Sequence, residues 1–80
     1  MIRVIAFARV RELVGFSERE FGLAETPTVG ALRARLEGDA PELARLRSST
    51  RVARNGLLVD DSATLSEGDE VALLPPVGGG

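Results

Sequence analysis

The nine residues RVARNGLLV, at Arg51–Val59, give the clearest local indication of the fold. Asn55-Gly56 lies between two short runs, and this dipeptide favours the type I′ turn that closes a two-residue β-hairpin. With these two residues as the loop, Ala53 faces Leu58 across the hairpin. Side chains alternate along a strand, so Leu58 and its neighbour Leu57 point to opposite faces, and we expect Leu58 to lie outside the core.

Three further segments have the composition of strands. Ile2–Ala8 and Ser17–Phe21 are rich in β-branched or aromatic residues, and Glu70–Leu74 is an apolar run that precedes Pro75-Pro76. Proline has no backbone N–H to donate, so the last strand is expected to end there. On the first strand, alternation places Phe7 on the face opposite the core, and we expect it to be exposed.

A helix is predicted over Val29–Glu37, where the apolar residues recur with the helical period of 3.6 residues instead of the strand period of two. Thr28 is placed to cap its first turn, and Gly38 is expected to end it. Gly30 inside this helix costs about 1 kcal/mol relative to alanine, so tertiary contacts rather than propensity are expected to hold the helix. Arg33 is spaced to form an i, i+4 ion pair with Glu37, the last residue of the predicted helix.

These elements predict one α+β domain, a small mixed sheet with one main helix packed across it. The chain has 80 residues, 44% of them hydrophobic, which is enough for one small core and excludes a second domain. Shorter helical turns are expected at Arg9–Val14, ending at Gly15, and after Pro41. Residues 1–75 are expected to form the domain, and residues 76–80 a flexible C-terminal tail.

Composition argues against chemistry performed by side chains. The sequence contains no cysteine and no histidine, so disulfides and the usual zinc ligands are missing. All ten basic residues are arginine, so no lysine can form a Schiff base, and serine or threonine hydroxyls have neither histidine nor lysine as a base. We therefore expect no metal site and no self-contained hydrolase. The adjacent Asp60 and Asp61 are interpreted as a solvated turn.

The charge balance argues against nucleic acid and membranes as partners. The net charge is −2, and the one local basic cluster has no aromatic residues among its arginines to stack on bases. We interpret that cluster as a solvated or partner-facing edge. It comprises Arg45, Arg47, Arg51 and Arg54. No apolar run approaches the roughly 20 residues that span a bilayer, and no signal-peptide pattern is present, so a cytoplasmic location is expected.

The C-terminal segment Pro75–Gly80 has two interpretations. A glycine-rich end is commonly disordered or a remnant of expression. Alternatively, two prolines stiffen the base of the segment, and glycines, which lack Cβ, let the backbone enter a narrow channel in another protein. The α-carboxylate of Gly80 is ionised at neutral pH and needs activation, with ATP as the obvious source, before a sulfur nucleophile can attack its carbon. In this second interpretation the main-chain end is reactive and partner proteins supply the catalysis.

Several motifs resemble the small subunits of molybdopterin synthase, the MoaD family, which are ubiquitin-like β-grasp sulfur carriers related to ThiS. The resemblance covers nearly the whole chain. The matching segments are Phe7–Gly15, Pro27–Val29 with Ala31–Arg33, Asn55, Glu67–Val77 and Gly79-Gly80. The terminal Gly-Gly is weak evidence by itself, whereas its combination with Leu-Pro-Pro-Val is specific. Gly78 is a departure, because relatives often have alanine or serine there.

The resemblance implies a β-grasp domain with no permanently bound cofactor. An E1-like adenylyltransferase (MoeB) would use ATP to adenylate Gly80, which would then become a thiocarboxylate. The tail, including Gly79, would enter the large synthase subunit (MoaE), in a heterotetramer of two small and two large subunits. There it would donate sulfur to cyclic pyranopterin monophosphate, with two charged carriers used per dithiolene.

The resemblance also implies a partner-binding surface. Its apolar centre maps to Phe7, Leu58 and Leu74, and the segment that leads to the reactive end would complete it. That segment comprises Pro75, Pro76, Val77 and Gly78. Alternation inferred from one sequence also permits all three apolar residues to be ordinary core. Other functions stay open on the sequence alone: a carrier for thiamine thiazole or tRNA thiolation, a ubiquitin-like protein modifier, or an interaction module with an inert tail.

Overall fold

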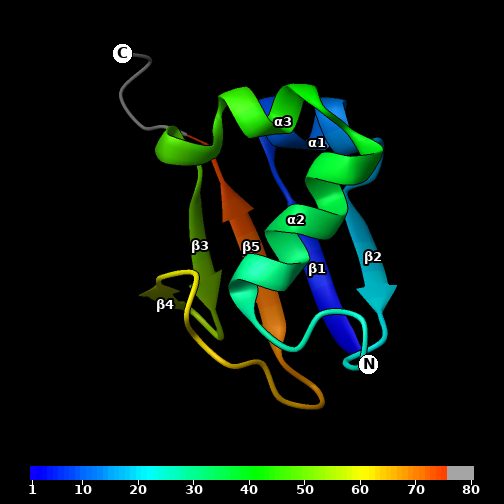
Figure 1. Ribbon diagram of the computed structural model, residues 1–80, viewed down its shortest axis with the longest axis vertical. Coiled ribbons are helices and arrows are strands. Elements are labelled where there is room, and N and C mark those ends of the chain that lie inside the picture. Colours follow the sequence, from blue (N-terminus) through cyan, green and yellow to red (C-terminus); the bar gives the residue numbers. More distant parts are fainter. Residues whose placement is uncertain (76–80) are drawn as a thin grey trace.

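A five-stranded mixed sheet forms the body of the protein, with its strands in the order β2-β1-β5-β3-β4 (Figure 1). In this computed structural model, residues 1–75 are described. The strands are β1 (Ile2–Ala6), β2 (Glu18–Phe21), β3 (Arg51–Arg54), β4 (Leu57–Val59) and β5 (Glu70–Leu74). The central strand β5 runs parallel to β1, and every other pair of neighbouring strands is antiparallel.

Helices cover one face of this sheet. They are α1 (Ala8–Val14), α2 (Val29–Asp39), α3 (Glu42–Arg45) and the 3₁₀ turn η1 (Arg47–Ser49). Figure 1 shows α2 lying across the sheet, with α1 and α3 near the end at which β1 and β5 finish. Between the two layers, the buried side chains of Ile2, Val4, Leu32, Leu36 and Leu73 form the centre of one core. The predicted α+β architecture with one main helix is therefore confirmed.

The β3–β4 hairpin has the predicted turn and register. Asn55 has a φ of 49° and Gly56 a φ of 87°, which is the left-handed pair that a type I′ turn requires. Ala53 pairs with Leu58 across the two strands, as the sequence predicts. The side chain of Asn55 also binds the next segment, because its Nδ2 donates to Asp69 Oδ1 at 2.9 Å and its Oδ1 accepts from Glu70 N at 2.9 Å. The hairpin is thus fixed to the start of β5.

The main helix begins as predicted and ends later than predicted. Thr28 Oγ1 accepts a 3.1 Å hydrogen bond from Ala31 N, which confirms its role as the N-cap. The helix continues through Gly38 to Asp39, so the predicted stop at Gly38 is wrong. Ala40 ends it with φ −135° and ψ 83°, because the residue before a proline is disfavoured in the helical region, and Pro41 follows.

The first strand is shorter than predicted and leads directly into a helix. β1 ends at Ala6, and α1 begins at Ala8 rather than Arg9. At Ala8 the chain changes direction abruptly, with a φ of 49°, a backbone conformation that residues other than glycine rarely adopt. α1 ends as predicted at Gly15, whose φ is 83°. Within residues 1–75, no helix has both the length and the apolar character that crossing a membrane requires.

The start of α2 is held by the segment that follows β4. Val29 N donates to Ala63 O at 3.0 Å, and Gly30 N donates to Asp61 O at 2.9 Å. These bonds satisfy N–H groups that a helix leaves free in its first turn. A Cβ on Gly30 would lie 3.2 Å from Asp61 O, so the absence of a side chain permits this close approach. Gly30 lowers the helix propensity of this segment, but it makes possible a tertiary contact between the helix and Asp61.

Candidate functional site

The face of the sheet opposite the helices carries a row of apolar side chains, which we call the apolar face. Ile5 pairs with Ala72, Ala72 with Ala53, and Ala53 with Leu58, so one row crosses four strands. The alternate positions on β1 and β5 are buried core residues, as is Val52 on β3, so this row points the other way. Leu74 lies two residues beyond Ala72 on the same side of β5.

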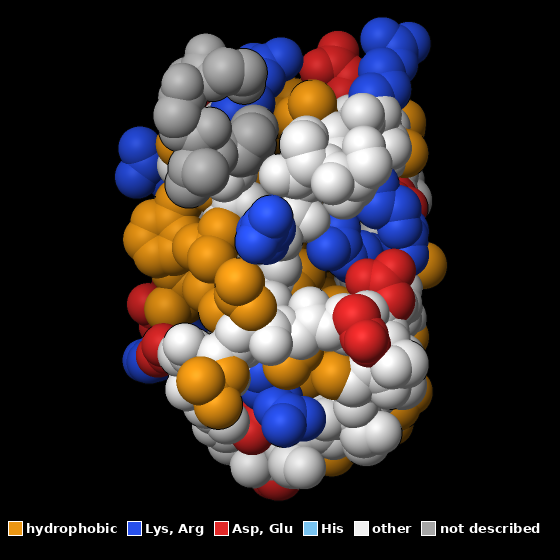
Figure 2. Space-filling view, turned by 90° about the vertical axis from the view of Figure 1, so that its left-hand side faces the viewer, with side chains coloured by type: hydrophobic (Ala, Val, Ile, Leu, Met, Phe, Trp, Pro, Cys, Tyr) orange, Lys and Arg blue, Asp and Glu red, His pale blue; other side chains and the backbone are white. Residues whose placement is uncertain are grey.

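Three residues predicted to dock partners lie on or beside the apolar face. Phe7 is 45% exposed and Leu58 58% exposed, while Leu74 is partly buried. The alternative that all three are ordinary core residues is therefore wrong. Figure 2 shows hydrophobic side chains gathered at the edge that faces away from the helices. Docking by these residues stays a prediction, but the geometry required for it is present.

The apolar face reaches the point where β5 ends. Pro75 follows Leu74 directly and is partly buried. The predicted reactive end and the residues that lead to it lie outside the described residues. These are Pro76, Val77, Gly78, Gly79 and Gly80. β5 lies between β1 and β3, so the strand that precedes the tail is bonded on both sides.

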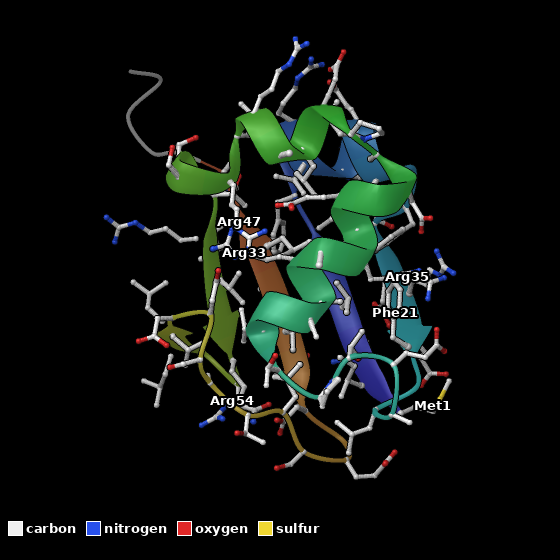
Figure 3. All side chains as sticks on the ribbon, in the orientation of Figure 1. Met1, Phe21, Arg33, Arg35, Arg47 and Arg54 are labelled. Atoms are coloured by element: carbon white, nitrogen blue, oxygen red, sulfur yellow. The ribbon has the colours of Figure 1, made fainter. Side chains whose placement is uncertain are left out.

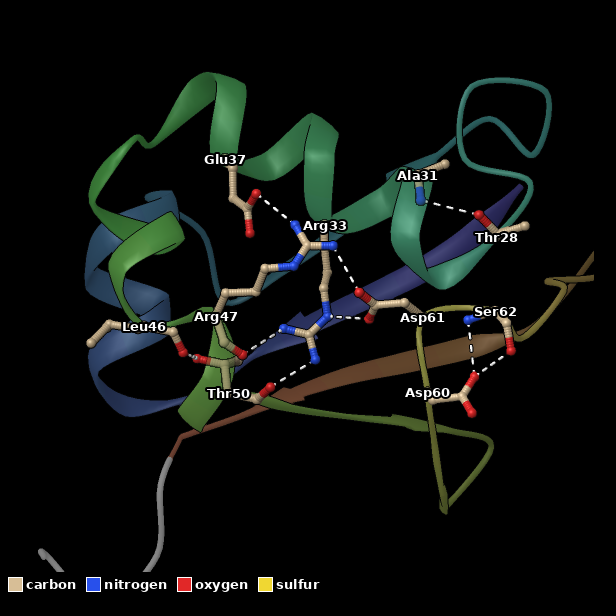
Figure 4. A network of polar contacts seen from close by, with 10 residues as sticks. All are labelled: Thr28, Ala31, Arg33, Glu37, Leu46, Arg47, Thr50, Asp60, Asp61 and Ser62. Carbon is tan, nitrogen blue, oxygen red and sulfur yellow. Dashed lines mark hydrogen bonds and ion pairs between the residues drawn. The ribbon is translucent and has the colours of Figure 1, made fainter.

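A network of four charged side chains joins α2, η1 and the segment after β4 (Figure 4). Arg33 Nε lies 2.8 Å from Asp61 Oδ1, and Arg47 Nη2 donates to Asp61 Oδ2 at 2.8 Å. Arg47 Nη1 also donates to Glu37 Oε1 at 2.7 Å. Hydrogen bonding from Arg47, with the nearby charge of Arg33, lowers the pKa of the Asp61 carboxyl below its ordinary value. The network therefore holds α2, η1 and the segment after β4 against one another.

This network corrects two sequence-based interpretations. Within residues 1–75, Arg33 forms no ion pair with Glu37, because its guanidinium reaches Asp61 and the carbonyls of Arg47 and Thr50. Asp61 is not part of a simply solvated turn, because it binds two arginines. Its neighbour Asp60 fits the original interpretation better, since it is exposed and accepts hydrogen bonds from Ser62.

The basic cluster divides into structural and free arginines. Arg47 belongs to the network, and Arg54 Nη1 donates to the carbonyl of Thr64 at 2.6 Å. Figure 3 shows Arg33 and Arg47 meeting between α2 and β3, with Arg54 toward the opposite end of β3. Arg45 and Arg51 are exposed and have no ion-pair partner among residues 1–75. Two of the four arginines are therefore available to a partner.

Arg51 borders a groove of about 620 Å³ between the β3–β4 hairpin and the ion-pair network. Val52, Leu58 and Val59 supply apolar walls, and Ser48 and Arg51 supply polar groups at its rim. Leu58 belongs to both the groove and the apolar face, so the two surfaces are continuous. This groove was not predicted, because it depends on how the segment after β4 folds against α2.

The described part of the chain does not assemble a catalytic group of side chains. Among residues 1–75, no three metal-ligating side chains come together. The hydroxyls of Ser49 and Thr50 donate to Leu46 O, which leaves them no base. The Ser62 hydroxyl donates to Asp60, and this bond lowers the pKa of the Asp60 carboxyl, making it a weaker base. The geometry instead offers a surface for partners and a strand that leads to the chain end.

Comparisons of sequence show one consistent set of relatives. The profile of the ThiS family matches residues 4–80. The molybdopterin synthase sulfur carrier subunit of Escherichia coli K12 is 45% identical over 82 residues, and the alignment covers all of both chains. These matches include the segment 76–80.

Comparisons of structure agree with the sequence. One similar structure is a complex of subunits 1 and 2 of the molybdopterin-converting factor from Helicobacter pylori, with TM-score 0.71, 26% identity, and coverage of 99% of this chain and 97% of that one. SAMP1 from Haloferax volcanii matches with TM-score 0.80, 30% identity, and coverage of 99% and 98%. A ubiquitin from Caldiarchaeum subterraneum matches with TM-score 0.61, 25% identity, and coverage of 99% and 95%.

The predicted ubiquitin-like β-grasp fold is thus confirmed, and so is the family resemblance. In the structure, the apolar face lies beside β5, the strand that leads to residues 76–80. By its full-length match, the chain belongs to the ThiS family and, within it, to the molybdopterin synthase sulfur carrier subunits.

Proposed function

We propose that this chain carries sulfur as a thiocarboxylate on Gly80 and donates it to cyclic pyranopterin monophosphate within molybdopterin synthase. The observation that carries the proposal is the full-length family match, which extends through the terminal glycines. The described body supports it, because no catalytic group of side chains assembles within residues 1–75. The reaction would then depend on the main-chain carboxylate and on partner proteins.

The chemistry requires two steps before sulfur can be transferred. An E1-like adenylyltransferase (MoeB) would direct an oxygen of the Gly80 carboxylate to the α-phosphate of ATP, with pyrophosphate as the leaving group. A sulfur nucleophile would then attack the acyl carbon, and AMP would leave as the C–S bond forms. ATP is thus a substrate of the activating enzyme, and the carrier itself needs no permanently bound cofactor or metal. A cytoplasmic location fits this supply of ATP.

The large synthase subunit (MoaE) would receive the charged tail. The similarity to a complex of two molybdopterin-converting subunits supports such a partner. The proposed assembly would contain two small and two large chains. Phe7, Leu58 and Leu74 would pack against the partner, and Pro75 would begin the segment that enters it. Burying apolar side chains contributes about 25 cal/mol per Å² before the costs of association, so this face can supply much of the binding free energy.

Within the entering segment, Gly79 and Gly80 would have to pass through the narrowest part of the partner. Pro76, Val77 and Gly78 would connect this end to the folded body. Glycine lacks Cβ, so it permits the close backbone approach that such a channel demands. The stiffness of consecutive prolines would direct the tail away from the sheet.

A ubiquitin-like protein modifier is the second candidate function. The 30% identity to SAMP1 from Haloferax volcanii, a small archaeal modifier protein, favours it. Both functions begin with the same adenylate. They differ in the nucleophile that resolves it, which is sulfur for the carrier and a substrate amine for the modifier.

Intact-mass spectrometry tests the proposal. The chain is incubated with ATP, a sulfur donor and the activating enzyme of the same organism. The carrier function predicts a mass increase equal to the exchange of one oxygen for sulfur, absent in a variant that lacks Gly80. The charged chain, mixed with the large subunit and cyclic pyranopterin monophosphate, should return to its original mass as the dithiolene forms. Covalent adducts with other proteins in place of the sulfur exchange would favour the modifier.

A further inference from the structure

Arg51 lies at the border of the apolar face and has no ion-pair partner among residues 1–75. It pairs in register with Leu74, the last residue of β5, and is therefore next to the point where the chain leaves the sheet. Strand alternation directs it away from the core, because its neighbour Val52 is buried. Within residues 1–75 no carboxylate pairs with its guanidinium, and Figure 2 shows basic side chains at the border of the hydrophobic area.

Three other arginines around this surface, Arg3, Arg33 and Arg47, already have carboxylate partners. At the opposite end of the apolar face, Arg3 pairs with Glu70 and lies 3.6 Å from Glu18. In the groove, Arg33 and Arg47 are held by Asp61. Next to the exit of β5 the apolar face therefore has a cation with no ion-pair partner among residues 1–75, whereas carboxylates outnumber the arginine at the opposite end.

The groove provides space for a group that would pair with this cation. Ser48 is exposed at the same rim, and no side-chain hydrogen bond occupies its hydroxyl among residues 1–75. Asp60 also lines the groove and has no ion-pair partner among residues 1–75. It belongs to the segment after β4, where its carboxylate accepts a hydrogen bond from Ser62 N. A negative group that approaches from the apolar face would therefore meet Arg51 and Ser48.

We propose that Arg51 binds a carboxylate of the large-subunit partner that docks on the apolar face, an inference that rests on the proposed carrier function. The partner surface that fits is apolar at its centre, opposite Phe7, Leu58 and Leu74, and carries an aspartate or glutamate at its edge. An ion pair enclosed by apolar contacts is less screened than one in open solvent, and charge pairs across an interface accelerate association. Arg51 thereby orients the carrier so that its chain end faces the partner.

The test compares charge reversals at two exposed arginines. Arg51→Glu removes the proposed cation and adds a repulsive charge, whereas Arg45→Glu makes the same change in net charge on α3, away from the apolar face. Binding of each full-length chain to the large subunit of the same organism is measured by calorimetry and by stopped-flow association at low and high salt. Circular dichroism melts confirm that both variants are folded.

We expect Arg51→Glu to weaken binding about tenfold at low salt, mainly through slower association, and Arg45→Glu to change it less than about twofold. The difference should shrink as salt rises, and Arg51→Gln should have an intermediate effect. Equal effects of the two reversals while the wild-type chain binds would overturn the role of Arg51 and leave the carrier function standing. A wild-type chain that does not bind the large subunit would overturn both.

Discussion

Gly30 N donates a 2.9 Å hydrogen bond to the carbonyl of Asp61, and a Cβ on Gly30 would lie only 3.2 Å from that same oxygen. At Gly38, in the same helix, a Cβ would meet no atom within 4 Å among residues 1–75 outside its own stretch of helix. We therefore expect Gly38→Ala to raise the free energy of unfolding by about 0.5–1 kcal/mol, and Gly30→Ala to give no such gain. Urea unfolding of both variants measures the difference in the free energy of unfolding. Equal stabilisation would show that the segment containing Asp61 moves to accommodate a Cβ at residue 30 without a cost in stability.

Ala8 provides a second pair of opposed substitutions. Its φ of 49° places a side chain in the left-handed region, at a cost of roughly 1–2 kcal/mol that glycine avoids. We expect Ala8→Gly to stabilise the fold by about 0.5 kcal/mol, because the lost strain exceeds the added freedom of the unfolded chain. The same change at the exposed helical residue Ala44 should destabilise it by a similar amount. Thermal melts that shift in the same direction for both variants would contradict this account.

Asp69 makes stability depend on acid pH. Its Oδ1 accepts from Asn55 Nδ2 and its Oδ2 from Ser66 N at 2.8 Å, and these bonds lower the pKa of the buried carboxyl. A lowered folded-state pKa stabilises the fold above the unfolded-chain value of about 3.9, and this contribution is lost as the pH falls through the lower folded value. Asn55→Gly keeps the left-handed turn and removes the donor. We expect it to be less stable at pH 7, by about 1 kcal/mol, and to lose less stability between pH 4 and pH 2 in urea titrations. A variant that loses as much stability as wild type over that range would exclude this bond as the cause.

Neighbouring leucines on β4 separate docking from general hydrophobicity. Leu58 shares the apolar face with Ala53, whereas Leu57, one residue away, pairs with Arg54 and is 73% exposed. We expect Leu58→Asp to weaken binding to the large subunit at least tenfold, because it places a charge in an apolar contact. Leu57→Asp should leave the affinity within about twofold. Calorimetric titration measures the affinity of both variants for the large subunit. Equal affinities would show that Leu58 does not lie in the interface.

Gly79→Val tests the need for a side-chain-free end. A branched side chain next to Gly80 would obstruct a narrow channel, so adenylation should fall by at least about a hundredfold while the melting temperature stays unchanged. ATP–pyrophosphate exchange with the activating enzyme measures this step directly. Normal exchange by a Gly79→Val chain would show that the end enters an open site.

The parts of the fold that local chemistry determines were predictable. Asn55-Gly56 adopts the left-handed pair that the sequence indicates, and Thr28 caps α2 through Ala31. Strand alternation correctly predicted that Phe7 is exposed, because one face of β1 is buried. Leu58 is exposed as predicted, but so is Leu57 on the other face of β4, so alternation alone does not account for it.

The parts that failed depend on segments distant in the sequence. Arg33 binds Asp61 instead of Glu37, and no spacing rule connects residues from α2 to the segment after β4. Gly38 stays helical because Ala40, before Pro41, ends the helix two residues later. The left-handed Ala8 had no signal at all, since alanine is the residue least expected there. The groove beside Arg51 results from these same long-range contacts.

The central position of β5 has a consequence for how the protein is made. β5 is the last strand along the chain, yet it separates β1 from β3 in the finished sheet. A nascent chain still lacking residues 70–74 has no ladder with which to join its two halves, and it exposes the apolar sides of both. Residues 70–74 must therefore be synthesised and must leave the ribosome before the sheet can close. Premature termination upstream of β5 yields a polypeptide that cannot complete its fold, so quality control by proteases would remove it before any enzyme could handle a defective end.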